Sequence, residues 1–570
     1  MASDALDRQL TRLEDAKRRV GEIDPARLET LLVTLGRQHY RDALSLVRFH
    51  DALLFLRAFP PSARVQRRAV SLLNSFSRRV ADLRKQGADL SLFDEEKYSG
   101  VAGTALCTDF HYDQVRWLLN RFPDRLDIDW DGYDRTGALA AALARFIPLL
   151  EEDSLVEADV PYRRWLQAAS RGRELSWLVA ACERLPLSRE EKAEIFGALE
   201  LPVRCELGNS SLTRTLGGRP VRTPYFHTRP FIRRNEVSLA RELSLPPLKL
   251  KKLSRREGER VLDLCREATT ARYRELYGTT RGDSNQVVQA NVGRGVEIFL
   301  WGLPPERRLP LRAYQAGFTL KNGVPINYIE GIALFEWMEI GFNTFYAYRD
   351  GETAWIYAQV LRMLHQVLGV TCISVYPYQI GQDNEEAIQS GAFWFYRKLG
   401  FRPMRKELAT LVTVEEKRIA SRDSYRTSAR TLRRLAQGHV VFELPGSPQG
   451  DWDGFAMRNL GFAVQQRMAD RYRGDAVTMR QALGRWAARA LGVRPAAWPA
   501  RERRAFENYA LVLGLIPDLP GWKIEEKTSL VEVILAKARA GDARYCRLLQ
   551  GQTRLRAWLR KLGSTRAAAR

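Results

Sequence analysis

Residues 384–403, NEEAIQSGAFWFYRKLGFRP, carry the most specific local pattern in this chain of 570 residues. Asn384 is a favourable N-cap residue, and the two glutamates that follow it suit the positive end of a helix dipole. Apolar residues recur at helical spacing, and Gly400, with a proline three residues later, supplies a stop signal. The pattern predicts one helix that carries Tyr396. Gly391 lies inside that helix, where it costs about 1 kcal/mol relative to alanine, so we expect another group to approach the backbone there.

The region before this helix predicts a mixed order of strands and helices. Ser254 with Glu257 forms a capping box that begins a helix. Lys321-Asn322-Gly323 separates two apolar runs, and Asn-Gly is the strongest short hairpin signal. A strand, a helix and a strand then form a right-handed parallel crossover. The expected strands are residues 248–253, 296–301, 311–320, 324–333, 340–347, 370–376 and 408–414, and the expected helices lie at residues 254–277 and 353–367.

Residues 384–403 resemble the last helix of the acetyl-CoA-dependent GNAT acyltransferase superfamily, whose pattern is roughly Asn-x-x-Ala-x-x-x-Tyr-x-Lys-x-Gly-Phe. Gln389 stands where the family usually has asparagine, and it keeps the carboxamide chemistry. The order of the expected elements is also the order of the family. An ordinary amphipathic helix that ends in Gly-Phe is the alternative. The positions that match in register are Ala392, Tyr396, Lys398, Gly400 and Phe401.

The resemblance implies an α/β fold class, in which a GNAT-like mixed sheet domain is flanked by mainly α-helical N- and C-terminal regions. We expect a helical N-terminal domain at residues 1–204 and a basic, proline-bearing linker at residues 205–247. The GNAT-like acyltransferase domain would occupy residues 248–415, and a basic helical region would follow at residues 416–570.

The resemblance also implies that acetyl-CoA, or another acyl-CoA, binds as co-substrate between the strands that flank the crossover helix. In the family these strands splay apart, the pantetheine arm pairs with exposed backbone groups, and amides at a helix N-terminus hold the pyrophosphate. The implied cofactor-binding residues are Tyr346, Arg349, Gly351, Thr353, Ala354 and Gln389.

The pyrophosphate loop departs from the family. The usual loop is Gln/Arg-x-x-Gly-x-Gly/Ala, whereas this chain has RDGETA at residues 349–354, so that Glu352 takes the place of the glycine. A carboxylate beside a pyrophosphate costs Coulomb energy of order 1 kcal/mol or more. Alternatively, Glu352 points away as a partner of the helix dipole. A plain helix start with no phosphate site is the third interpretation.

Acyl transfer to an amine requires a base, a donor to the tetrahedral oxyanion and an acid that protonates the leaving thiolate. Tyr396 matches the family's position for the acid, and a core tyrosine is the alternative. The candidate bases are Glu330, Glu336 and Glu339. We select Glu339 because it lies ten residues before Arg349 and alternates with Gly341 on one strand face. A surface glutamate at a sheet edge is the alternative.

The composition is typical of a globular protein of several domains. Hydrophobic residues make up 45% of the chain, which also holds 13 tryptophans, and this excludes a disordered class. The 6 cysteines and 6 histidines are dispersed, which predicts reduced thiols and neither a disulfide framework nor a metal site. The amino terminus lacks an apolar secretory core, and the apolar runs are too short to span a membrane. We therefore expect a cytoplasmic protein with no membrane partner.

The net charge of +23 invites a nucleic-acid interpretation. Arginines interleave with Tyr225, Phe226 and Phe231 in the linker, a pattern that suits single-stranded nucleic acid or a phosphorylated ligand. A linker that docks on the catalytic domain is the alternative.

Two functional hypotheses follow from the sequence. The first is an acyl-CoA-dependent N-acyltransferase, most simply an acetyltransferase, that acts on an unidentified amine by direct transfer. The second is a non-catalytic GNAT-like binding or scaffold protein, which engages nucleic acid or a protein partner through its basic surface.

Overall fold

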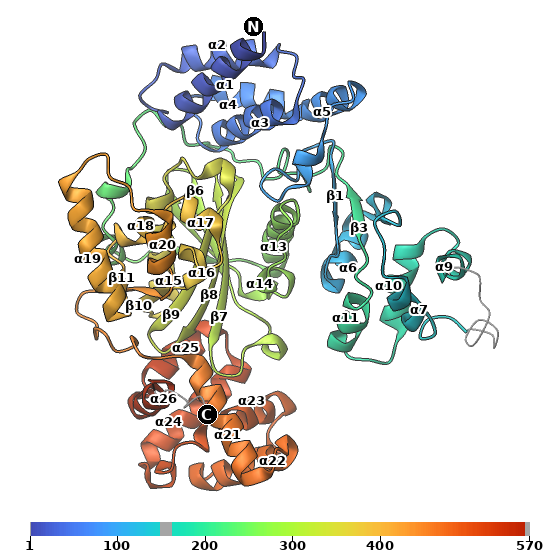
Figure 1. Ribbon diagram of the computed structural model, residues 1–570. Coiled ribbons are helices and arrows are strands. Elements are labelled where there is room, and N and C mark those ends of the chain that lie inside the picture. Colours follow the sequence, from blue (N-terminus) through green and yellow to red (C-terminus); the bar gives the residue numbers. More distant parts are fainter. Residues whose placement is uncertain (1, 149–161, 565–570) are drawn as a thin grey trace.

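The computed structural model describes residues 2–148 and 162–564. Figure 1 shows a nine-stranded sheet at the centre, a helical lobe above it, a second lobe to its side and a helical region below it. The architecture is α/β with a mixed sheet. Residues 1, 149–161 and 565–570, which belong to the predicted helical flanks, lie outside the described residues.

The central sheet has the strand order β11-β12-β10-β9-β8-β7-β6-β5-β4. The strands from β4 to β9 form an antiparallel meander, and α15 (Thr353–Leu368) then crosses over so that β10 pairs parallel to β9. Asn322 and Gly323 turn between β7 and β8 with φ of 48° and 75°, so the predicted Asn-Gly hairpin is confirmed. The strands are β4 (Leu250–Lys252), β5 (Val288–Gly293), β6 (Val296–Trp301), β7 (Ala313–Lys321), β8 (Val324–Leu334), β9 (Trp337–Thr344), β10 (Cys372–Val375), β11 (Arg402–Pro403) and β12 (Val440–Glu443).

Helices cover both faces of this sheet. α13 (Arg255–Thr270) begins at the predicted capping box of Ser254 and Glu257, and α14 (Tyr277–Thr280) follows it. The hydroxyl of Tyr314 on β7 accepts a hydrogen bond from an amide of α14, so α13 and α14 lie on one face. Phe342 on β9 packs its ring 4.8 Å from that of Tyr357, which places α15 on the other face. We call these the α13 face and the α15 face.

The predicted final strand at residues 408–414 is wrong. These residues belong to α19 (Lys406–Ser421), in which Leu408 and Val412 are buried one helical turn apart. The strand beside β10 is β12, which pairs antiparallel with β10 and carries the edge strand β11 on its other side. The sheet therefore includes residues past the expected boundary at residue 415, and the short segment at residues 440–443 was not predicted as a strand.

The helix predicted for residues 384–400 consists of two short helices, α17 (Glu385–Gln389) and α18 (Ala392–Arg397). Gly391 separates them with a φ of 65°, a left-handed conformation that glycine adopts without strain. No atom lies within 4 Å of a Cβ built at this position. The glycine therefore serves the bend between the helices, and the expected close approach of another group is wrong.

The expected helical domain at residues 1–204 comprises two different units. Helices at residues 2–85 share one hydrophobic core with the central sheet, whereas the described residues between 106 and 212 pack mainly around a core of their own. The second unit contains a three-stranded antiparallel sheet in the order β1-β3-β2, whose strands of three or four residues gave no pattern in the sequence. The first unit holds α1 (Ala2–Arg18), α2 (Pro25–Gly36), α3 (Ala43–Ala58), α4 (Ala63–Asn74) and α5 (Phe76–Lys85). The second holds β1 (Ala105–Thr108), α6 (Tyr112–Arg121), β2 (Leu126–Ile128), α7 (Thr136–Leu143), α9 (Tyr162–Ser170), α10 (Glu174–Arg184), α11 (Arg189–Gly197) and β3 (Val203–Glu206).

The proline-bearing segment at residues 205–247 docks between the first helical unit and the central sheet. His227 donates its backbone amide to the carbonyl of Pro60, and its ring is buried among Phe59, Tyr225 and Phe231. The segment ends in α12 (Leu239–Leu243), which packs on α15. This arrangement is the docked linker that the sequence left as an alternative.

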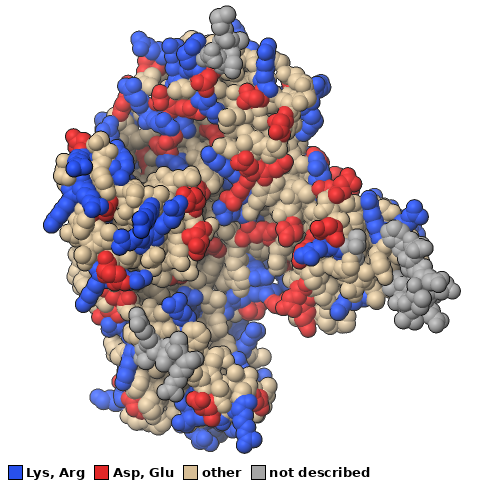
Figure 2. Space-filling model, viewed as in Figure 1, with Lys and Arg blue, Asp and Glu red and all other residues tan. Residues whose placement is uncertain are grey.

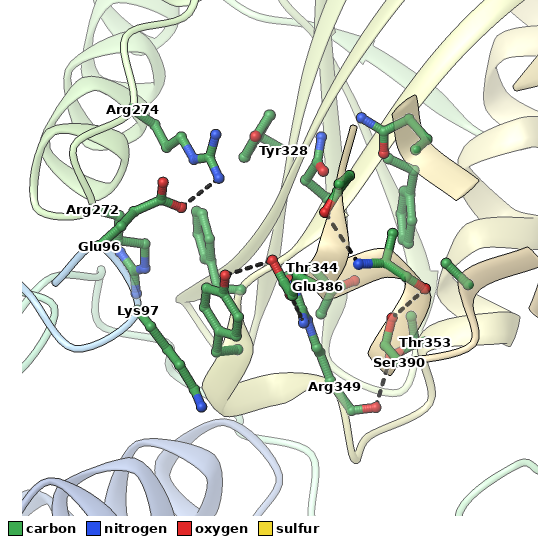
Figure 3. Close-up of a pocket in the computed structure, with 18 of the residues that line it drawn as sticks. Glu96, Lys97, Arg272, Arg274, Tyr328, Thr344, Arg349, Thr353, Glu386 and Ser390 are labelled. Atoms are coloured by element: carbon green, nitrogen blue, oxygen red, sulfur yellow. Dashed lines mark hydrogen bonds and ion pairs between the residues drawn. The ribbon is translucent and has the colours of Figure 1, made fainter. Parts of the chain in front are cut away.

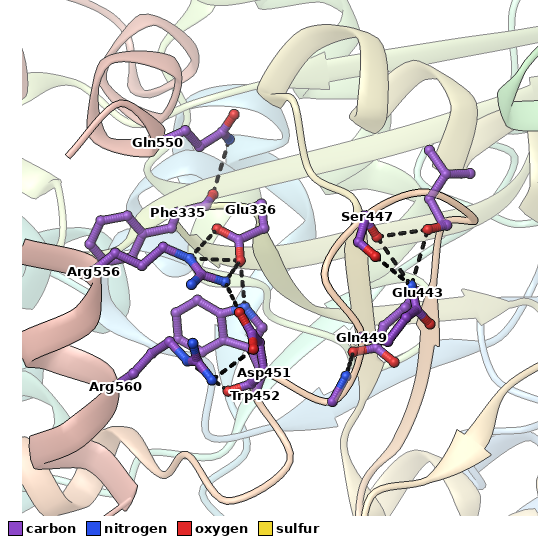
Figure 4. Close-up of polar contacts among 12 residues, drawn as sticks. Phe335, Glu336, Glu443, Ser447, Gln449, Asp451, Trp452, Gln550, Arg556 and Arg560 are labelled. Atoms are coloured by element: carbon purple, nitrogen blue, oxygen red, sulfur yellow. Dashed lines mark hydrogen bonds and ion pairs between the residues drawn. The ribbon is translucent and has the colours of Figure 1, made fainter. Parts of the chain in front are cut away.

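The C-terminal helices attach at the end of the sheet where β9 begins. Figure 4 shows Glu336 accepting hydrogen bonds from Arg556 of α26 and from the indole of Trp452, while Asp451 pairs with Arg556 and Arg560. None of the helices in the described ranges is both long enough and apolar enough to cross a membrane. The helices of this region are α21 (Met457–Tyr472), α22 (Ala476–Leu491), α23 (Ala500–Leu513), α24 (Ile524–Arg539), α25 (Asp542–Gln550) and α26 (Thr553–Ser564). α20 (Ala429–Leu435) instead packs on α17 and α19 beside the sheet (Figure 1).

The buried imidazole of His227 makes the stability of the docked linker depend on pH. Burial, with the nearby charges of Lys321 and Arg294, lowers the pKa of His227 from 6.5 to about 2. Below pH 6.5 the imidazole of His227 is protonated in the unfolded chain but stays neutral in the folded chain. The free energy of unfolding therefore decreases as the pH falls from 6.5 toward 2. The loss is at most about 1.4 kcal/mol per pH unit.

We therefore expect the thermal unfolding midpoint of His227→Phe to fall less than that of the wild type between about pH 7 and pH 5. The exposed His39 of the first helical unit provides the control His39→Phe, in which the unfolding midpoint should change with pH as it does in the wild type. An unchanged slope in His227→Phe would contradict the prediction.

Candidate functional site

The two parallel strands pair for only part of their length. β9 and β10 pair from Trp337 with Cys372 to Ile340 with Val375, which is the last residue of β10. The chain then turns at Pro377 into α16 (Pro377–Ile380), while β9 continues to Thr344 along β8. Residues 341–344 of β9 therefore have no strand partner on the side of β10, and only the backbone groups of alternate residues, those that point away from β8, border the opening.

A cavity of about 360 Å³ lies at this opening (Figure 3). Its lining includes residues 342–347 of β9 and the turn that follows it. Phe342 and Asn343 point to opposite faces of the strand, and both line the cavity, so the cavity reaches both faces of the sheet. The other lining residues are Glu96, Lys97, Arg214, Arg272, Arg274, Tyr328, Arg349, Thr353, Tyr378, Gln379, Asn384, Glu386, Ala387, Ser390, Ala392, Phe395 and Tyr396.

On the α15 face, an arginine, a tyrosine and a glutamate form one polar group. Glu386 of α17 pairs with Arg349 and accepts a hydrogen bond of 2.6 Å from the hydroxyl of Tyr346. The guanidinium of Arg349 also lies 4.1 Å from the centre of the Tyr346 ring and donates to the carbonyl of Thr344. Burial alone would raise the pKa of Glu386, but the hydrogen bonds from Tyr346 and Arg349 outweigh it and lower this pKa. The guanidinium of Arg349 is thus already paired with the carboxylate of Glu386.

Glu352 does not face the cavity. Its side chain is 1% exposed, pairs with Arg294 and accepts a hydrogen bond of 3.0 Å from the amide of Ile232. Within residues 2–148 and 162–564, the first-turn amides of α15 at residues 353–355 donate to no acceptor. The charge conflict expected from this loop is therefore absent, because the carboxylate turns into the interface with the linker.

The loop before α15 divides its residues between the cavity and a neighbouring hollow of about 570 Å³. Arg349 and Thr353 border both, whereas Gly351 and Ala354 line only the hollow, together with Arg234 of the linker. A Cβ at Gly351 would lie 2.6 Å from the ring of Phe59, so this glycine permits the first helical unit to pack on the loop.

Tyr396 of α18 lines the cavity with its ring buried. The ring contacts Tyr357 at 5.8 Å and Phe401 at 5.4 Å between centroids. Its hydroxyl has no hydrogen-bond partner in the part of the chain that the structure describes. Burial raises the pKa of Tyr396, so the hydroxyl keeps its proton at neutral pH.

The three candidate bases have different surroundings. Glu339 forms a hydrogen bond with His439, with 3.1 Å between its Oε2 and the ring Nε2, and lies two residues before the opening, but it does not line the cavity. Glu330 is opposite Gly341 in β8, and its hydrogen-bond donor is Tyr314; burial raises its pKa. Glu336 anchors the C-terminal helices (Figure 4). Glu339 is therefore the candidate that lies on β9 beside the strand opening with a partly exposed side chain.

The structure brings four of the predicted site residues together around the cavity: Tyr346, Arg349, Thr353 and Tyr396. It places four elsewhere: Gly351 and Ala354 in the neighbouring hollow, Gln389 exposed at the end of α17, and Glu339 along the strand.

Sequence reasoning missed the charged residues of the opposite wall and assigned Glu386 only to a helix dipole. Lys97, Arg272 and Arg274 reach the cavity from loops outside the recognised motifs. The available signal was Arg-Tyr-Arg at residues 272–274, inside the predicted helical segment 254–277, and it did not indicate where these side chains point.

Comparison of the chain with protein-family models, with curated proteins and with solved structures found no match. Function is therefore inferred from the geometry and chemistry of the cavity.

Proposed function

We propose that this chain is a GNAT-like, acyl-CoA-dependent N-acyltransferase, with acetyl-CoA as the simplest donor. The observation that carries the proposal is the separation of β9 from β10 after Ile340 and Val375, with Tyr396 in the cavity at the opening. A thioester arm that lies along residues 341–344 can pair with backbone groups that have no strand partner. The element order from β4 to α18 supports the same assignment.

The donor phosphates would lie at the start of α15. The backbone N–H groups of residues 353–355 have no acceptor among the described residues, and the N-terminus of an α-helix favours anions. Arg349 and Arg234 border the adjacent hollow, and burial of Glu352 removes its charge from the surface. Tyr346, Arg349, Thr353 and the loop at residues 351–354 are thus the proposed donor-binding residues, and Gln389 takes no part.

The reaction forms a bond between the amine nitrogen and the acyl carbon and breaks the bond from that carbon to sulfur. The backbone amides among residues 341–344 that point away from β8 are the proposed donors for the developing oxyanion. Tyr396 would give its proton to the leaving thiolate, and its raised pKa keeps that proton in place beforehand. Glu339, coupled to His439, is the proposed base for the amine on the α13 face.

The alternative is a GNAT-like binding protein that holds nucleic acid through a basic surface. Phe231 packs on Phe55 and Phe59, and Arg214 is buried, so these linker residues are not free to stack on bases or pair with phosphates. On the face shown in Figure 2, lysine and arginine are spread over all lobes and interspersed with aspartate and glutamate. These observations favour the enzyme over the nucleic-acid scaffold.

Calorimetry with acetyl-CoA tests the proposal directly. We expect binding by the full chain, weakened at least about tenfold by Arg349→Glu because the substitution places a second carboxylate beside Glu386. Arg430→Glu makes the same charge change at an exposed position of α20 and should leave binding intact. Absence of binding together with salt-dependent retention of RNA or DNA would favour the scaffold instead.

Glu386→Gln should bind acetyl-CoA more tightly than the wild type. The substitution frees Arg349 from a carboxylate that a donor phosphate must displace. Because both side chains are about two-fifths exposed, we expect a gain of about 3- to 5-fold, or up to 1 kcal/mol. The same titration measures it, and weaker binding would show that Glu386 supports the donor site.

Tyr396→Phe should lower kcat by about 10²- to 10⁴-fold with little change in the affinity for acetyl-CoA, because the acid is lost while packing is kept. Release of free thiol from acetyl-CoA with a panel of amines provides the measurement. Tyr357→Phe is the matched control, since it removes a neighbouring buried hydroxyl that has no partner. Equal effects of the two substitutions would make Tyr396 a core tyrosine.

A further inference from the structure

The wall of the cavity on the α13 face is built from cationic side chains. Arg272 and Arg274 follow the C-terminal end of α13, and Lys97 comes from the loop before β1. Tyr328 lies beside them, directly opposite Asn343 in the β8–β9 register, which assigns this wall to the α13 face. Figure 3 shows these side chains across the cavity from Arg349 and Thr353.

Arg272 differs from the other arginines of the cavity in its partners. Arg274 pairs with Glu96, Arg349 pairs with Glu386, and Arg214 lies 3.3 Å from Asp51. Arg272 has no carboxylate within ion-pair distance in the described residues. The nearby charges are Asp51 and two further arginines, the half-buried Arg57 and the buried Arg214, so three guanidiniums share one carboxylate, and Tyr348 also lies nearby.

Such an excess of buried positive charge is costly. Arg272 is 8% exposed, and the effective penalty for burying an uncompensated ion is several kcal/mol. Its guanidinium lies 3.9 Å from the centre of the Phe345 ring and donates one hydrogen bond, to the carbonyl of Ala268. The remaining N–H groups have no acceptor among the described residues. Burial lowers the pKa of Arg272 only to about 10, so it is a cation at neutral pH.

Lys97 supplies a second cation at the mouth of the cavity. Its ammonium group lies 4.8 Å from the ring centre of Tyr98 and 5.9 Å from that of Tyr346, and no carboxylate of the described ranges pairs with it. A buried guanidinium and an exposed ammonium on the same wall fit an anion that enters from the mouth.

We propose that Arg272 and Lys97 bind an anionic group, a carboxylate or a phosphate, on the acceptor, so that the acceptor is a small acidic amine. This inference rests on the proposed acyltransferase function, in which the donor lies on the α15 face. The cavity of about 360 Å³ must also admit the end of the thioester arm, and this restricts the acceptor to a small molecule. The arginine would orient the acceptor so that its amine faces the strand opening.

Binding of four small amines to the full chain, measured by calorimetry, tests the proposal without any need for turnover. β-Alanine carries a carboxylate and phosphoethanolamine a phosphate, whereas β-alaninamide and ethanolamine keep the amine and lack the anion. We expect one or both of the acidic amines to bind at least about tenfold more tightly than its neutral counterpart. The preferred acid identifies the anionic group.

Arg272→Gln should abolish this preference, and Arg260→Gln should retain it, because Arg260 is an exposed arginine of α13, the helix that precedes Arg272, with no ion pair in the described residues. Should Arg272→Gln fail to fold, Lys97→Gln at the exposed mouth provides the second variant, with an expected loss of about threefold. Equal binding of acidic and neutral amines, or full retention of the preference in both variants, would overturn the proposal.

Acetyl-CoA titrations of the same variants separate this inference from the proposed function. If acetyl-CoA binds and the acidic amines do not, the acceptor inference fails while the acyltransferase proposal stands. If the acidic amines bind through Arg272 and acetyl-CoA does not bind, the acyltransferase proposal fails. A loss of acetyl-CoA affinity in Arg272→Gln as large as that of the acidic amine would assign Arg272 to the donor phosphates and overturn the inference.

Discussion

Pairing between β9 and β10 stops after Ile340 and Val375. Every feature of the candidate site depends on this separation of the two strands. Pro377 has no amide hydrogen, and its fixed φ suits the first turn of a helix, so the chain starts α16 instead of extending β10. β8 holds β9 in an extended conformation as far as Thr344. One edge of β9 is thereby left without a partner, while the other edge keeps it rigid.

The first helical unit and the linker complete this site. Phe59 packs against Gly351, and Arg294 with the amide of Ile232 draws Glu352 away from the first turn of α15. Arg214 donates to the carbonyls of the loop that carries Lys97. Residues 248–415 alone would therefore expose Glu352 and lose part of the α13 face wall. The two faces of the cavity are positioned by packing that spans the first half of the chain.

Local patterns predicted the central elements well. The capping box at Ser254, the Asn-Gly hairpin and the crossover helix each depend on contacts within a few residues, and each is present. The error at residues 408–414 arose because β-branched residues suggested a strand, whereas burial at Leu408 and Val412 follows a helical period. β12 was missed because three apolar residues followed by a glutamate do not distinguish a strand from a buried turn.

The sequence predicted those residues of the candidate site that belong to a local motif. It did not predict the residues that tertiary contacts bring to the site. Tyr346, Arg349, Thr353 and Tyr396 lie within two short segments that flank the crossover, and they meet at the cavity. Gly351 lines the neighbouring hollow instead of the cavity, and it packs against Phe59, which is far away in sequence. The cationic wall depends on loops before β1 and after α13, and their convergence follows from domain packing, which no local pattern encodes.

Charges on the two walls of the cavity are arranged differently, and in the proposed function this difference would favour a different kind of anion at each wall. On the α15 face, Glu386 already neutralises Arg349, so an incoming anion must compete with a carboxylate. In the proposed function, a donor with several phosphate charges would win that competition because its Coulomb attraction is larger and the α15 amides would add hydrogen bonds. A singly charged acid would gain little there. On the α13 face, Arg272 has no carboxylate partner among the described residues, and a single negative charge would relieve part of the cost of its burial. Under the two proposals, polyanions would therefore bind at one wall and small acids at the other.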